Sequence, residues 1–150
     1  MHPTALNILA SIHVLSSQIG RAFYGEIAKR HGVTVPEWRV LLTLAQRPAA
    51  TAGEIAAQWA MEKMAVSRAV RRLERDGLVA RRTVRNDRRR QALRLTATGR
   101  RLYARILPAA DARYRAIMAC LGPSERAGLR RSLARLIAET ERLAEASEGV

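Results

Sequence analysis

The residues best suited to chemistry in this sequence are arginines, which are concentrated between residues 60 and 105. This segment holds 15 of the 27 basic residues and four of the 13 acidic residues, so most of the net charge of +14 lies in under a third of the chain. A guanidinium is a planar fork of donors that matches phosphates and the edges of bases. Composition bias explains the preference for Arg over Lys equally well, but the position of the charge predicts a polyanionic partner.

Other chemistries have no candidate residues. The single cysteine and three unclustered histidines predict neither a disulfide nor a metal site. The sequence contains no Gly-rich phosphate loop, no GxSxG and no HExxH, and no nucleophile and base can be paired. We therefore expect no enzyme activity, no metal and no cofactor. The sequence has no run of about 18 apolar residues, the length that a membrane-spanning helix needs. A single cysteine fits a protein of the reducing cytoplasm.

The elements that must position the arginines are predicted to be mainly helical, with one small β-hairpin. Apolar residues recur at helical spacing in most of the chain, whereas two short segments alternate apolar and polar residues as half-buried strands do. Two Thr-x-x-Glu capping boxes, at Thr34 and Thr51, mark helix starts. The expected helices cover about residues 4–30, 34–47, 51–59, 61–76, 96–121 and 122–146, and the expected strands cover residues 78–84 and 91–95.

The helix expected over residues 61–76 could present its arginines to DNA. Val66, Val70 and Leu73 share one face and are expected to point into the core. The other faces carry short polar and arginine side chains, and a helix has about the right width for the DNA major groove. A solvated face explains this charge if the helix is considered alone.

The predicted hairpin carries four further arginines near its tip, Arg85, Arg88, Arg89 and Arg90. Such a tip can reach a neighbouring minor groove, where narrow A·T-rich DNA concentrates negative potential. The direct succession of helix, short turn, helix and basic hairpin is much harder to explain by chance than any one of these elements. The arrangement therefore predicts binding to double-stranded DNA.

Two motifs in these elements resemble those of the MarR family, bacterial winged helix-turn-helix regulators. Residues 67–79, S-R-A-V-R-R-L-E-R-D-G-L-V, are similar to that family's recognition helix and the start of its wing. Asp87-Arg-Arg and L-R-L-T-A-T-G at residues 93–99 match the family's wing signature, D-x-R followed by L-x-L-T-x-x-G. The resemblance implies one domain over residues 1–150, with a winged helix-turn-helix lobe at about 34–95 and dimerisation helices at about 4–31 and 97–146.

The resemblance implies a homodimeric, sequence-specific transcriptional regulator on a pseudo-palindromic operator, most often a ligand-responsive repressor. Apolar stripes in the first and last helices agree with a dimer, although packing within the monomer would also explain them. A sequence-neutral architectural nucleic-acid-binding protein is the alternative, since charge alone would suffice for it. The residues expected at the dimer interface are Ile8, Ile12, Leu15, Leu133, Leu136 and Leu143.

The expected roles in DNA binding differ along the chain. Ser67 and Arg68 are expected to contact base edges, and Asp87 to orient the wing by pairing with an arginine. Thr51 begins a helix whose N-terminus could bind a phosphate, although its capping role is sufficient to explain it. The residues expected at or near phosphates or in the minor groove are Lys63, Arg71, Arg72, Arg85, Arg88, Arg89 and Arg90.

Relatives often sense small aromatic or phenolic acids in a crevice between the dimerisation helices and the DNA-binding lobe. Core packing explains the aromatic candidates in this chain at least as well. Some relatives sense oxidants through a cysteine near the start of the first helix, but Cys120 lies far from there and is expected to be a buried structural cysteine. The candidate lining residues are His13, Phe23, Tyr24, Trp38 and Arg39.

Overall fold

The structure is a computed structural model that describes the backbone of residues 3–84 and 87–148 and the side chains of residues 7–21, 29–82 and 91–147. It contains two compact units, Met1–Ala110 and Asp111–Val150. None of the helices in the described ranges is long and apolar enough to cross a membrane. The elements are α1 (Pro3–His31), α2 (Val35–Gln46), α3 (Ala52–Gln58), α4 (Lys63–Arg75), β1 (Val79–Val84), β2 (Asp87–Leu95), α5 (Ala97–Met118) and α6 (Pro123–Glu148).

Both predicted capping boxes are present and begin α2 and α3. The Thr34 hydroxyl accepts a hydrogen bond from the backbone N–H of Glu37, whose carboxylate accepts from the N–H of Thr34. Thr51 and Glu54 make the same reciprocal pair. Each box satisfies two N–H groups that a helix start leaves without partners. The helix starts were therefore predicted correctly from the Thr-x-x-Glu spacing.

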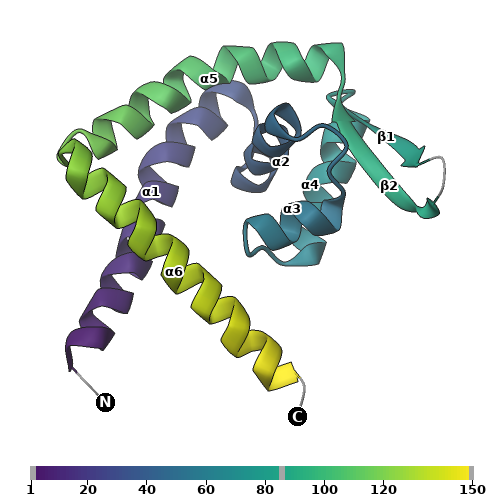
Figure 1. The fold of residues 1–150 in the computed structure, drawn as a ribbon. Coiled ribbons are helices and arrows are strands. Elements are labelled where there is room, and N and C mark those ends of the chain that lie inside the picture. The colour runs from purple at the N-terminus through teal and green to yellow at the C-terminus, as the bar shows by residue number, and fades with distance from the viewer. Residues whose placement is uncertain (1–2, 85–86, 149–150) are drawn as a thin grey trace. The chain divides into compact units, whose positions relative to one another are not determined.

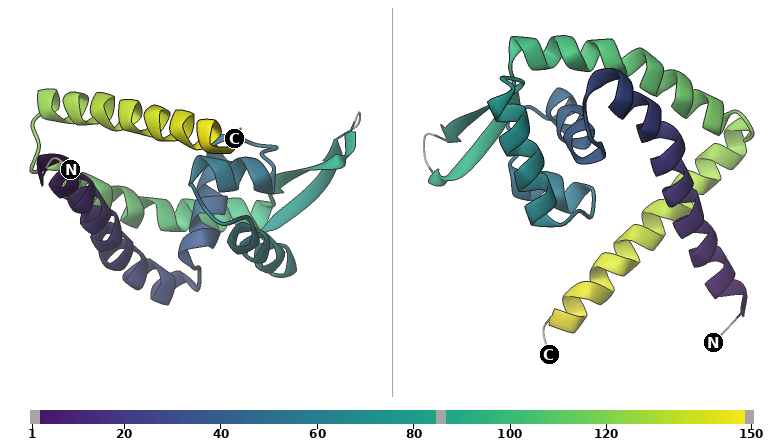
Figure 2. Two further views of the ribbon diagram at one scale, coloured as in Figure 1. Left: turned by 90° about the horizontal axis from the view of Figure 1, so that it is seen from below. Right: turned by 180° about the vertical axis from the view of Figure 1, so that it is seen from behind.

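A hydrophobic core lies among α2, α3, α4, the hairpin and the first turns of α5. Its largest fully buried side chains include Trp38, Leu41, Ile55 and Leu73. Figure 1 shows α2, α3 and α4 grouped beside the hairpin, and both views of Figure 2 show the hairpin extending outward from them. The core thus fixes α4 and the base of the hairpin in one body.

The second strand is longer than predicted. β2 begins at Asp87, not at residue 91, so the expected six-residue tip is shorter and the backbone of Arg88–Arg90 belongs to the strand. The pairing runs from Val79 opposite Leu95 to Thr83 opposite Gln91, and then shifts its register. The sequence prediction relied on alternating apolar and polar residues, and the run of arginines has no such alternation. The strand extends through this run by backbone pairing, which leaves no signal in the sequence.

Thr96 and Gly99 join the base of the hairpin to α5. The Thr96 hydroxyl donates to the carbonyl oxygen of Gly77 at 2.7 Å and accepts from the N–H of Gly99 at 3.0 Å. The N–H of Thr96 donates to the carbonyl oxygen of Leu78 at 3.0 Å. A Cβ atom at residue 99 would overlap that same carbonyl oxygen. The T-x-x-G part of the motif is therefore a close contact between α5 and the start of β1.

We expect Gly99→Ala to lower the free energy of unfolding by about 1–3 kcal/mol, because the added methyl meets a backbone atom that cannot rotate away. Urea denaturation at one protein concentration measures the change. Gly53→Ala in the first turn of α3 is the matched control, since its added Cβ would meet only ordinary van der Waals contact with Thr51 Oγ1 at 3.9 Å. Equal midpoints for the two variants would refute this account of Gly99.

The second compact unit contains the end of α5 and the whole of α6. Leu129, Leu133, Leu136 and Leu143 of α6 are exposed in the single chain. Cys120 is also exposed, so the prediction of a buried cysteine is wrong. It lies in the short turn after α5, where its thiol donates to the carbonyl oxygen of Ile117 at 3.3 Å. Helical periodicity did not locate this turn.

Candidate nucleic-acid interface

A short turn joins α3 to α4 and sets the second helix across the first. Ala60 adopts a positive φ of 47° in this turn, and the N–H of Met61 donates to the carbonyl oxygen of Ala56 at 2.9 Å. The indole N–H of Trp59 donates to the hydroxyl of Thr43 in α2 at 2.8 Å. The arrangement is a helix-turn-helix whose turn is attached to α2.

The faces of α4 are those that the sequence predicted. Val66, Val70 and Leu73 are buried, together with Ala69. Ser67 and Glu74 are partly buried, and the other long side chains outside the core face solvent. A row of donors therefore lies outside the core on a helix of the width that enters a major groove. The exposed residues are Lys63, Met64, Arg68, Arg71, Arg72 and Arg75.

The arginines of this region divide into paired and unpaired groups. Arg72 lies 3.5 Å from Glu37 and 3.7 Å from Asp76, and Arg81 lies 2.8 Å from Glu74. Arg75 lies 3.8 Å from Asp76. Among the described side chains, Lys63, Arg68 and Arg71 have no acidic partner within salt-bridge distance. Their charges are available to an external anion.

Several predicted contacts fall on residues whose side chains lie outside the described ranges. Arg85 is outside the described residues altogether. Asp87, Arg88, Arg89 and Arg90 are described as backbone of β2, so their roles at DNA stay predictions. Thr51 is described, and its hydroxyl accepts from the N–H of Glu54 at 3.2 Å, which is its capping role.

Two of the five predicted effector residues, Phe23 and Tyr24, have side chains outside the described ranges. The other three have different surroundings. Trp38 is 1% exposed and stacks on Tyr103 with ring centroids 5.6 Å apart. The guanidinium of Arg39 lies 5.1 Å from the centre of the Trp59 ring, whereas His13 is exposed on α1. Trp38 is thus a core residue, as the alternative interpretation held.

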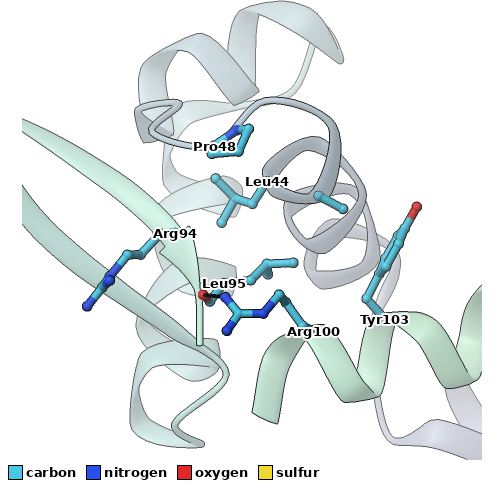
Figure 3. A pocket seen from close by; sticks show the side chains of 7 residues that line it. Leu44, Pro48, Arg94, Leu95, Arg100 and Tyr103 are labelled. Atoms are coloured by element: carbon cyan, nitrogen blue, oxygen red, sulfur yellow. Dashed lines mark hydrogen bonds between the residues drawn. The ribbon is translucent and has the colours of Figure 1, made fainter. Parts of the chain in front are cut away.

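Sequence reasoning missed a pocket of about 460 Å³ at the base of the hairpin. Figure 3 shows Arg100 lying along it, where the guanidinium donates to the carbonyl oxygen of Leu95 at 3.1 Å. The backbone after α2 is bonded to β2 through Ala49, whose N–H donates to the carbonyl oxygen of Leu93. This long-range pairing has no local sequence signal. The lining residues are Leu44, Ala45, Pro48, Arg94, Leu95, Arg100 and Tyr103.

His31 is a titratable group in the last turn of α1. Partial burial, followed by the positive charges of Arg105 and Arg30, lowers the pKa of His31 below its usual value. The lowered pKa favours the neutral form of the imidazole. Among the residues with described side chains, no three His, Cys, Asp or Glu residues lie close enough to hold a metal ion.

Known proteins resemble this chain in both sequence and fold. Residues 31–90 match the sequence profile of the MarR family. The homoprotocatechuate degradative operon repressor of Escherichia coli is 33% identical over 98 residues, which cover 65% of this chain and 66% of the repressor. The HTH-type transcriptional regulator FarR of Neisseria gonorrhoeae is 34% identical over 110 residues, which cover 73% of this chain and 75% of that protein.

Among solved structures, the MarR/EmrR family transcriptional regulator from Acinetobacter sp. ADP1 has a TM-score of 0.85 and 22% identity, covering 92% of this chain and 97% of that one. This likeness shows the fold, a helix-turn-helix with a hairpin wing between terminal helices. The sequence relatives show the family, which consists of DNA-binding regulators and not of enzymes. The chain belongs to the MarR family of winged helix-turn-helix transcriptional regulators.

Proposed function

We propose that this chain, acting as one domain over residues 1–150, is a cytoplasmic repressor that binds a pseudo-palindromic operator in double-stranded DNA as a homodimer. The observation that carries the proposal is the exposed face of α4, where Arg68 and Arg71 have no acidic partner among the described side chains. Two relatives support repression, since the Escherichia coli protein is named as an operon repressor and the Shigella flexneri protein carries the same name.

A gel-shift titration with the DNA flanking the chain's own gene tests the proposal against random DNA of the same length. A specific regulator is expected to bind one fragment at least about 10³-fold more tightly than random sequence. A twofold-symmetric dimer should protect two half-sites about 10 base pairs apart. Equal affinity for all fragments would support the sequence-neutral architectural protein instead.

Exposed apolar side chains support the homodimer. Ile8 and Leu15 of α1 are 55% and 50% exposed, and Leu136 and Leu143 of α6 are 41% and 52% exposed. Side chains of this kind at helical spacing gain free energy when a second copy covers them. The predicted interface residues Ile12 and Leu133 belong to the same two stripes.

The salt dependence of binding should report the number of phosphates contacted. If each subunit displaces about five counterions, log K falls with log[salt] with a slope of roughly −9 per dimer. Arg71→Ala and Arg89→Ala should each flatten the slope by about 2, because a homodimer loses two contacts. Filter-binding measurements at salt concentrations between about 50 and 300 mM, chosen at equal steps in log[salt], give this slope. An unchanged slope for Arg89→Ala would argue against insertion of the wing.

For the effector, we propose a small aromatic or phenolic acid in the pocket at the base of the hairpin. Arg100 offers positive charge beside the apolar walls formed by Leu44 and Leu95, whereas the guanidinium of Arg94 points away from the pocket in Figure 3. The proposed dimer has two DNA-binding lobes, and their spacing must match the two half-sites of the operator. An acid that binds more tightly to a dimer with a different spacing would shift the population away from the DNA-binding form.

Release of operator DNA by a panel of aromatic acids tests this site. Arg100→Ala is expected to raise the half-effective acid concentration at least about tenfold, since a charge-assisted hydrogen bond contributes about 1.5–3 kcal/mol. Arg101→Ala is the control, because Arg101 is exposed and donates to Thr98. Loss of response in His13→Ala with a normal response in Arg100→Ala would instead place the acid in the crevice first predicted.

A further inference from the structure

Glu37 is a buried carboxylate whose surroundings extend beyond its capping role. It is 4% exposed, whereas Glu54, which occupies the equivalent place in the second capping box, is only partly buried. A buried carboxylate is costly unless it is both hydrogen-bonded and paired with a positive charge. One oxygen, Oε2, accepts the N–H of Thr34 at 2.8 Å. The other oxygen requires a second partner.

That partner comes from α4. Nε of Arg72 lies 3.5 Å from Oε1 of Glu37, and the Arg72 side chain is 47% exposed. The same guanidinium lies 3.7 Å from Asp76, which caps the C-terminal end of α4. Arg72 therefore connects the first turn of α2 to the last turn of α4, and both helices belong to the same compact unit.

Arg68 lies one helical turn before Arg72 and thus on the same side of α4. The two arginines line one open groove of about 390 Å³ with Thr34, Pro36, Glu37, Ala65 and Ala69. A rotation of α4 about its axis that moved Arg72 away from Glu37 would also move Arg68. The direction in which Arg68 leaves the helix therefore depends on the Glu37–Arg72 contact as well as on the buried face of α4.

We propose that Glu37 and Arg72 are positioning residues that, together with the buried face of α4, fix the rotation of this helix, so that Ser67 and Arg68 meet the correct base edges. This inference rests on the proposed sequence-specific binding. Arg72 acts through the orientation of the helix and not as a phosphate contact, which revises the role expected from the sequence. Glu37 then determines specificity although it carries the same sign of charge as DNA.

Glu37→Gln separates this role from simple electrostatics. The amide keeps an oxygen to accept from Thr34 and nearly the same shape, but it removes the negative charge. If Glu37 acted only as a charge, its removal would tighten binding to operator and random DNA alike. Under the proposal, operator affinity falls at least about tenfold, since one base contact in each half-site is poorly matched, while random-sequence affinity does not fall. The ratio of the two affinities is the readout.

Arg72→Gln provides the second measurement. A positioning residue leaves the salt slope unchanged, whereas a phosphate contact flattens it by about 2 per dimer, as expected for Arg71→Ala. The double variant Glu37→Gln/Arg72→Gln should lose no more specificity than either single variant, since the two residues act as one unit. Thermal melts and helical circular dichroism establish that each variant is folded.

The outcomes distinguish this inference from the function on which it rests. If the wild type shows no preference for any sequence, the proposed regulator function fails. If the wild type prefers an operator and Glu37→Gln keeps the same affinity ratio, the positioning role is overturned. A flatter salt slope for Arg72→Gln would likewise overturn it and return Arg72 to the phosphate backbone.

Discussion

Arg68→Ala is expected to weaken operator binding by about 2–6 kcal/mol per dimer, because each of two subunits loses a base contact that contributes about 1–3 kcal/mol. Affinity for random DNA should change much less, since only one positive charge per subunit is removed. The physical reason is the exposed guanidinium on the outer face of α4, which has no acidic partner among the described side chains. The operator preference should therefore relax at one base position in each half-site.

Competition gel shifts with single-base operator variants measure this change. Arg75→Ala is the matched control, because Arg75 is on the same helix, is 75% exposed at its side chain and lies 3.8 Å from Asp76. It removes the same charge but is expected to preserve sequence preference. Equal weakening on every sequence by Arg68→Ala would show that Arg68 contacts phosphates and not bases.

Local sequence signals predicted much of the fold and the face of α4. The two Thr-x-x-Glu boxes fixed the starts of α2 and α3, since a cap depends on residues only three apart. The spacing of Val66, Val70 and Leu73 identified the buried side of α4 because one helix face repeats at that interval. These features depend on short stretches of chain.

Features that depend on distant residues were not predicted. The pairing of Glu37 with Arg72 joins residues 35 positions apart in the sequence, and neither residue marks the other. The pocket beside Arg100 forms because the chain after α2 bonds to β2. The early start of β2 and the exposed turn that holds Cys120 were missed for another reason, since neither alters the apolar periodicity.

The second large effect is expected at the proposed dimer interface. Leu133 and Leu136 of α6 are 36% and 41% exposed in the single chain. If a second copy covers them, the double variant Leu133→Glu/Leu136→Glu places four carboxylates in an apolar contact, where an unpaired charge costs several kcal/mol. The dimer should dissociate at micromolar concentration, and the mass in solution should fall to the 16.7 kDa of one chain.

Loss of the dimer should reduce operator affinity at least about 10³-fold, because a monomer holds one half-site and gives up the effective concentration that links the second. Sedimentation equilibrium and gel shifts on the same samples connect the two effects. Arg131→Glu is the control, since it introduces a carboxylate on α6 about 200° around the helix from Leu129. If the leucine variant stayed dimeric and bound normally, α6 would not hold the subunits together. If the leucine variant stayed dimeric but bound the operator weakly, Leu133 and Leu136 would contribute to DNA binding and not to dimer formation.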